Sequence, residues 1–162
     1  MIVFDDKFVC YQLCKAAGLP LPKEYGCIEP NENYNYRIRS ILSNMENDKI
    51  IIKPILSDGG KNIAVAYKEG QEIFVQILEK KQPLDNYILQ SRSVIQEYIH
   101  QHDALNHTSS ATNTIRIVTL YTKEKNVLIV GALMRFGRNK ALIDNISQGG
   151  IAVGIDLEVG SL

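Results

Sequence analysis

The sequence predicts an α+β fold built on antiparallel sheets. Helical patterns occur only in the first half of the chain, and short β-branched or alternating runs separated by turn residues dominate the rest. The 162 residues, 45% hydrophobic and 22% charged, correspond to one domain or to one domain with part of another. This composition excludes a disordered chain.

The charge balance and the number of cysteines narrow the class of protein further. Lys and Arg number 18 and so do Asp and Glu, so a net charge of 0 gives no reason to expect a nucleic acid or a membrane surface as partner. The longest apolar run, 127–134, is too short to span a bilayer, and no signal peptide is recognisable. The 3 cysteines argue against a disulfide framework, so we expect a reducing, cytoplasmic location.

The first quarter of the chain alternates helices with extended segments. A helix is expected over residues 5–17, with an aspartate at its start and Gly18 after its last turn. The proline-rich segment 19–22 indicates a stiff extended linker. A short strand over 24–28 and a helix over 36–44 follow.

The middle of the chain predicts a hairpin with a glycine-rich tip. Residues 49–54 form a continuous β-branched run typical of a buried strand, a tight turn covers 57–62, and a second strand covers 63–67. The segment 72–79 is ambiguous between helix and strand. Alternation predicts a further strand over 94–99.

The last third begins with a polar segment rich in turn formers, 100–113, which we expect to be a loop. Two strong strands over 114–121 and 127–136 follow, joined by a short turn as an antiparallel hairpin. Residues 140–146 and 151–156 are candidates for two more strands.

Two groups of metal-ligand residue types have simpler explanations. Cys10 and Cys14 have helical spacing, and we expect small apolar residues on a buried helix face, with metal binding as the less favoured alternative. His100, His102 and His107 lack partners at zinc-site spacing, so a polar loop is favoured.

The first candidate site is Lys53 with the glycine loop that follows it. Glycines permit close backbone approach, backbone amides donate to anionic oxygens, and lysines such as Lys61 supply charge, so the segment suits a phosphate. The strand-to-helix phosphate-loop pattern is absent. An ordinary hairpin turn at Gly59 and Gly60 remains the alternative.

The second candidate is the strand that ends in Gln96, Glu97, Tyr98 and Ile99. An exposed strand edge offers the donor and acceptor that an adenine requires, and Asp103 downstream could accept from ribose hydroxyls. The alternative is an ordinary strand that leaves the core.

The third candidate is a group of arginines in the late strands. Arg116 interrupts an apolar strand, which is unfavourable unless its guanidinium meets an anion or faces a groove. Arg135 ends the neighbouring strand, so the two could clamp a phosphate or carboxylate, whereas a solvent-facing position for both is the alternative. The polar and glycine residues grouped with them are Arg138, Asp144, Asn145, Gly149 and Gly150.

These groups, in this order, resemble an ATP-grasp protein, most closely the sugar-transfer-associated ATP-grasp group. The matching stretches are DDKFVCYQLCKAAGLPLPK, IIIKPILSDGGKNI, VIQEYIHQH, TNTIRIVTL, MRFGR and IDNISQGGIAVGIDLEVGSL. The resemblance covers nearly the whole chain and is weakest over 68–92. It implies a small antiparallel-sheet nucleotide-binding subdomain and the first strands of a larger one.

The resemblance also implies roles for single residues. Lys53 is similar to the lysine on the α/β phosphates, and the residues from Ser57 to Lys61 to the flap over them. Residues 96–99 resemble the hinge that reads adenine, with Asp103 as a ribose ligand. The residues implied around the γ-phosphate and acyl-phosphate site are Arg116, Arg135, Asn145, Gly149 and Gly150.

The implied activity is that of an ATP-dependent carboxylate–amine ligase, which forms an acyl phosphate and needs no protein nucleophile. The implied partners are ATP, Mg²⁺ and a carboxylate from a small molecule or glycan precursor of polysaccharide or cell-envelope biosynthesis. The alternatives are a phosphotransferase on the same fold and an inactive interaction module that associates with itself through exposed strand edges.

One departure from the family concerns the metal. The acidic-x-Asn motif that holds Mg²⁺ is not recognisable here, so we expect its ligands beyond residue 162 and a truncated chain with weak nucleotide binding. The expected divisions are a helix and linker over 1–23, a small subdomain over 24–99 and a partial second subdomain over 100–162.

Overall fold

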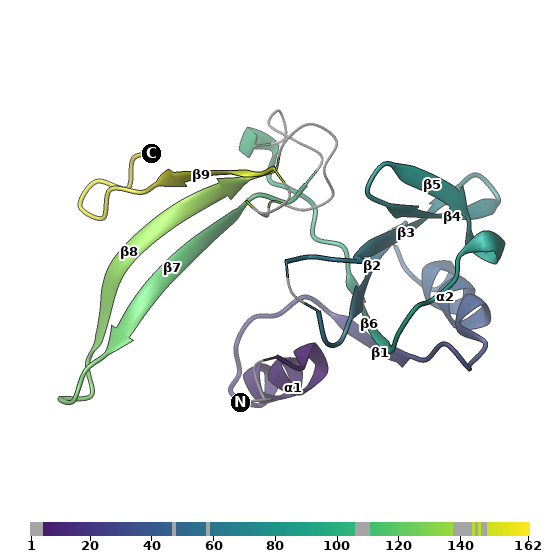
Figure 1. Cartoon of the computed structure of the whole chain (residues 1–162), viewed down its shortest axis with the longest axis horizontal. Helices are drawn as coiled ribbons and strands as arrows, with labels where there is room; N and C mark the ends of the chain where they lie inside the picture. The colour runs from purple at the N-terminus through teal and green to yellow at the C-terminus, as the bar shows by residue number, and fades with distance from the viewer. Residues whose placement is uncertain are drawn as a thin grey trace. The chain divides into compact units, whose positions relative to one another are not determined.

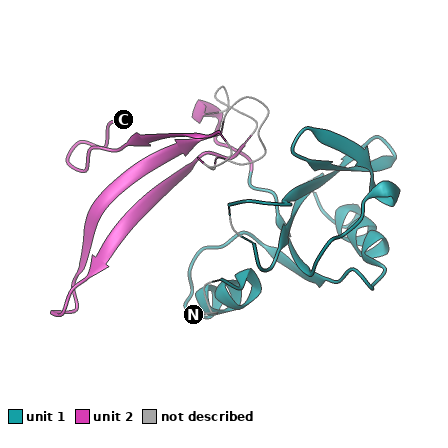
Figure 2. Cartoon of the chain, in the orientation of Figure 1, with its two compact units in different colours: residues 1–99 teal, residues 100–162 magenta. Residues whose placement is uncertain are grey.

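A computed structural model describes residues 5–46, 48–57, 59–105, 111–137, 144, 146 and 149–162. The chain divides into two compact units, Met1–Ile99 and His100–Leu162 (Figure 2). Helices and antiparallel sheets together confirm the α+β class. Among the described helices, none has the length and apolarity required to cross a bilayer.

Unit 1 is built on a six-stranded antiparallel sheet in the order β1-β6-β2-β3-β4-β5 (Figure 1). The strands are β1 (Glu24–Ile28), β2 (Lys49–Pro54), β3 (Ala64–Glu69), β4 (Glu72–Ile77), β5 (Lys80–Pro83) and β6 (Ser93–Glu97). The ambiguous segment 72–79 is therefore a strand. The sequence analysis missed β5, because two lysines and a proline are typical of a sheet edge and not of a strand interior.

The core of unit 1 forms between the sheet and helix α2 (Tyr34–Ser43). The side chain of Asn33 accepts from the Tyr36 amide and begins the helix two residues earlier than predicted. Ile38 and Leu42 of α2 are buried. They belong to one apolar cluster with Ile28, Ile50, Ile52, Ala64, Ala66, Ile73, Val75, Leu84, Tyr87, Leu89 and Ile95.

Strand β2 is buried on one face only. Its residues alternate between half-buried and buried, so the continuous β-branched run does not form a strand covered on both faces. Ile50 and Ile52 face the core, whereas Ile51 and Lys53 lie on the opposite face. That face of the sheet carries the first candidate site.

Helix α1 (Lys7–Ala16) contributes nothing to the core. The Asp6 carboxylate caps it by accepting from the amides of Phe8 and Val9, each at 2.9 Å. No residue of α1 is buried, and Cys10 and Cys14 are only half-buried. The predicted buried helix face is therefore wrong, because the core of unit 1 packs against α2.

Unit 2 is a three-stranded sheet in the order β7-β8-β9. It comprises β7 (Thr114–Tyr121), β8 (Val127–Phe136) and β9 (Ile151–Gly154), preceded by the 3₁₀-helix η3 (Asp103–Leu105). The bounds predicted for the β7–β8 hairpin are confirmed. The strand predicted over 151–156 is β9, two residues shorter, and most of the one predicted over 140–146 lies outside the described residues.

Both faces of the β7–β8 hairpin expose apolar side chains. Ile115 and Ile117 on one face are 59% and 55% exposed, and Val118 and Leu120 on the other are 47% and 53% exposed. Unit 2 therefore leaves apolar surface in contact with solvent on either side of its sheet.

Candidate functional site

Lys53 lies near the end of β2 on the sheet face opposite the core. Its Nζ donates to the Gln96 side-chain Oε1 at 3.0 Å, and β6 supplies that glutamine from the neighbouring strand. Burial lowers the pKa of Lys53, and the positive charge of Lys7 lowers it further. The site therefore has a positive potential, which favours the binding of an anion.

Lys7 is a second cation at this site, and the sequence analysis missed it. Its Nζ donates to the Ser57 carbonyl at 2.6 Å and the Ser57 hydroxyl at 3.1 Å. Its backbone N–H also donates to the Ile55 carbonyl at 3.2 Å, and Asp6 forms an isolated β-bridge with Leu56. The start of α1 thereby fixes the segment that leads into the glycine loop.

A sequence signal for Lys7 did exist. It occupies the first turn of a helix, where the helix dipole disfavours a positive charge. A lysine at such a position indicates a partner elsewhere in the fold, and here that partner is Ser57.

The glycine loop has the backbone that its sequence predicts. Gly59 and Gly60 have φ of 65° and 75°, in the left-handed region that glycine adopts without strain. Lys61 beyond them is exposed, and Asp58 lies outside the described residues. The loop begins at the segment that Lys7 holds and connects β2 to β3.

The predicted exposed strand edge at Gln96 and Glu97 is wrong. Strand β6 is an interior strand, paired with β1 on one side and β2 on the other. The Glu97 N–H donates to the Lys23 carbonyl at 2.8 Å. Tyr98 and Ile99 follow the end of the strand, and a hinge would have to use these two residues.

The face of the sheet that carries Lys53 and Gln96 also carries a carboxyl group, that of Glu24 on β1. Glu24 is the cross-strand partner of Gln96. Its Oε2 is buried and has no hydrogen-bond partner among the described residues, and burial raises its pKa while the charge of Lys15 lowers it. Replacing this group would remove an unsatisfied buried oxygen.

In unit 2, Arg116 and Arg135 share one face of the β7–β8 sheet. Thr114 lies opposite Arg135, and Arg116 lies opposite Leu133, so the arginines are diagonal neighbours across the two strands. Arg116 is exposed, whereas the Arg135 side chain is only 24% exposed. The alternative of two solvent-facing arginines therefore describes Arg116 and not Arg135.

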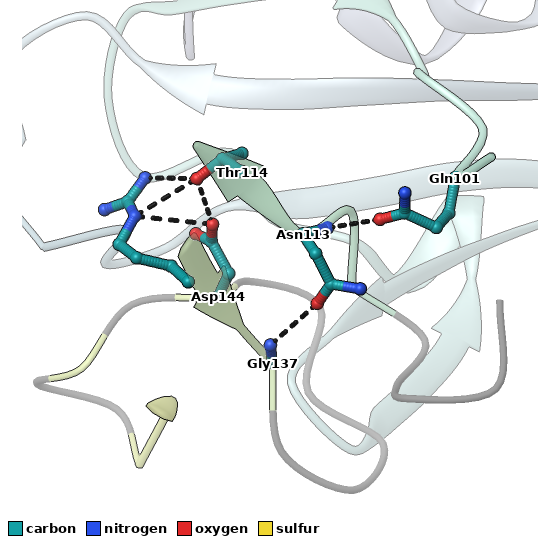
Figure 3. A network of polar contacts seen from close by, with 6 residues as sticks. Gln101, Asn113, Thr114, Gly137 and Asp144 are labelled. Carbon is teal, nitrogen blue, oxygen red and sulfur yellow. Dashed lines mark hydrogen bonds and ion pairs between the residues drawn. The ribbon is translucent and has the colours of Figure 1, made fainter. Parts of the chain in front are cut away.

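Arg135 belongs to a polar network (Figure 3). Its Nε and Nη2 donate to the Thr114 hydroxyl at 3.1 and 2.7 Å, and its Nε lies 3.4 Å from the Asp144 carboxylate. The Thr114 hydroxyl in turn donates to Asp144. The Asn113 side-chain oxygen accepts from the Gly137 amide at 3.1 Å and secures the end of β8.

The remaining predicted site residues lie near the ends of unit 2. Asp103 is exposed in η3. Gly149 has a φ of 89° and is exposed, and Gly150 leads into β9. Asn145 and Arg138 lie outside the described residues.

The structure therefore brings the predicted residues together in two groups. In unit 1, Lys53 bonds to Gln96, Lys7 bonds to Ser57, and the charge of Lys7 lowers the pKa of Lys53. Gly59 and Gly60 follow this group along the chain. Arg116 and Arg135 are neighbours in unit 2.

The described residues do not fit a magnesium cage. No cluster of three or more His, Cys, Asp or Glu side chains lies together in the part of the chain that the structure describes. Mg²⁺ at phosphate sites is usually held by one or two carboxylates together with the phosphates of the substrate, so it does not require such a cage.

A half-buried lysine followed by a glycine loop, on an antiparallel sheet backed by a helix, fits the ATP-grasp class of protein. The model of one family, described as sugar-transfer associated ATP-grasp, matches residues 1–162, and the chain belongs to this family. No curated protein and no solved structure matches the chain.

Proposed function

We propose that the chain binds ATP and activates a carboxylate as an acyl phosphate, which an amine or similar nucleophile then attacks. The observation that carries this proposal is the desolvated Lys53 ammonium beside the glycine loop. A half-buried cation is unfavourable unless it is paired. Among the described residues, the hydrogen-bond partner of the Lys53 Nζ is the Gln96 side-chain oxygen, which carries no charge. A phosphate would supply the missing negative charge.

Each residue has a role in this reaction that follows from its chemistry. Lys53 and Lys7 neutralise phosphate oxygens, and the backbone of Gly59 and Gly60 approaches them closely. The carboxylate oxygen attacks the γ-phosphorus and the bond to the β-phosphate oxygen breaks, so ADP leaves. In unit 2, Arg116 and Arg135 supply two guanidinium groups of the kind that stabilises the charge of a phosphoryl group.

The substrate class follows from the family. Association with sugar transfer supports a carboxylate on a glycan or cell-envelope precursor as the acceptor of the phosphoryl group. The nucleophile then displaces inorganic phosphate, and the protein contributes positioning and charge without a covalent intermediate of its own.

Isothermal titration calorimetry tests the nucleotide site. Lys53→Gln should weaken ATP binding at least about tenfold, since a charge-assisted hydrogen bond contributes roughly 1.5–3 kcal/mol. Lys80→Gln removes the same charge from an exposed lysine on the edge strand β5 and should change ATP binding little. Equal affinities for the two variants would refute the role of Lys53.

The exposed apolar side chains of the β7–β8 hairpin favour a second candidate function, self-association as an interaction module. Light scattering distinguishes the two functions. A discrete dimer whose mass does not change with ATP supports the module, and a monomer that binds ATP supports the nucleotide site.

A further inference from the structure

Thr114 stands at the centre of the polar network in unit 2. Its hydroxyl accepts from Arg135 Nε and Nη2 at 3.1 and 2.7 Å and donates to Asp144 Oδ2 (Figure 3). A hydroxyl has one donor and two acceptor positions. Two side chains therefore fill all three positions of Thr114, which leaves its hydroxyl no freedom to rotate.

The same contacts fix Arg135. A guanidinium carries five N–H groups in a rigid plane, and Thr114 engages one on Nε and one on Nη2. Among the described residues, Thr114 and Asp144 are the acceptors that Arg135 contacts, which leaves three of its N–H groups for a ligand. The entropy of ordering this long side chain is lost when the protein folds and not when a ligand binds.

Arg116 complements this fixed guanidinium. It lies two residues after Thr114 on the same strand and therefore on the same sheet face, diagonal to Arg135. Among the described residues, no carboxylate forms an ion pair with Arg116. The face thus combines one ordered and one exposed guanidinium.

We infer that Thr114 is a positioning residue that, with Asp144, holds Arg135 as a preformed site for a phosphoryl or acyl-phosphate oxygen. This inference rests on the proposed function and assigns a role to a residue that carries no charge. Thr114 acts through Arg135, and Arg116 adds a second charge from the exposed end of the same face.

Two-dimensional NMR of the full chain with ¹⁵N-labelled arginine tests the inference. Inorganic phosphate is titrated while the Nε–H signals of Arg116 and Arg135 are followed. Thr114→Val keeps the shape of the side chain and removes the hydroxyl, and should weaken phosphate binding about three- to tenfold. Thr114→Ser should retain the wild-type affinity. Thr119→Val, on the other face of β7, is the matched control.

A double-mutant cycle separates positioning from general stabilisation. Thr114→Val combined with Arg135→Gln should bind phosphate no more weakly than Arg135→Gln alone. In the wild-type protein, the Arg135 Nε–H should also exchange with water more slowly than that of Arg116, which keeps the test independent of how the variants fold.

The outcomes distinguish two failures. If both arginines respond to phosphate but Thr114→Val binds as tightly as wild type, or its effect adds to that of Arg135→Gln, the positioning role is overturned and the proposed function stands. If neither arginine responds to phosphate, the anion site of the proposed function is overturned together with this inference.

Discussion

Lys7→Gln should loosen the segment before the glycine loop. The Lys7 ammonium makes two short hydrogen bonds to Ser57, at 2.6 and 3.1 Å, and a longer one of 3.4 Å to the Ile55 carbonyl. Two such bonds in a half-exposed site contribute about 1–2 kcal/mol in total, since each contributes roughly 0.5–1.5 kcal/mol. Gln reaches Ser57 with a shorter, uncharged side chain and should lose most of this stabilisation.

Urea denaturation followed by circular dichroism measures this loss. Lys80→Gln, on an exposed edge strand, is the control for removal of one positive charge. The substitution of Lys7 should also raise the pKa of Lys53, because Lys7 is one of the two causes that lower it. An unfolding free energy of Lys7→Gln equal to that of the control would refute the anchoring role.

Three further predictions concern the backbone, the buried lysine and the polar network. Gly26→Ala should destabilise unit 1 by about 1–3 kcal/mol in urea denaturation, because φ is +94° and the new Cβ, 2.5 Å from Arg37 Nη2, would displace the end of that side chain. Gly70 also has a positive φ, but no atom lies near the Cβ that alanine would add, so Gly70→Ala should lower the free energy of unfolding less. The folded state disfavours the charged form of Lys53, so wild-type stability should rise as pH increases through its lowered pKa, and Lys53→Met should flatten that dependence. Asp144→Asn removes the charged partner of Arg135 and should therefore speed the exchange of the Arg135 Nε–H with water in the NMR experiment.

The sequence predicted the elements whose signals are local. The β-branched run at residues 49–54 and the two apolar runs joined by a short turn at 123–126 gave strands with the correct bounds. Glycines 59 and 60 marked a turn because only glycine adopts their φ without strain. These features depend on neighbours in the chain, so a single sequence contains them.

The features that the sequence could not supply depend on contacts between distant segments. Thr114 meets Asp144 across 30 positions of the chain, and Lys7 meets Ser57 across 50. Nothing in the sequence of β6 indicates that this strand lies between β1 and β2, so the prediction of an exposed edge was wrong. The cysteines of α1 were expected to be buried because their spacing is helical, although spacing does not say which helix covers the core.

The central claim is that the ammonium of Lys53 receives the phosphates of ATP. The most direct measurement is a pH titration of the Lys53 side-chain ¹³Cε signal in the full chain, with and without ATP, and with adenosine as the control ligand. We expect ATP to raise the pKa of Lys53 toward or above its ordinary range, and adenosine to leave that pKa lowered. A Lys53 pKa that stays lowered at saturating ATP would contradict the account.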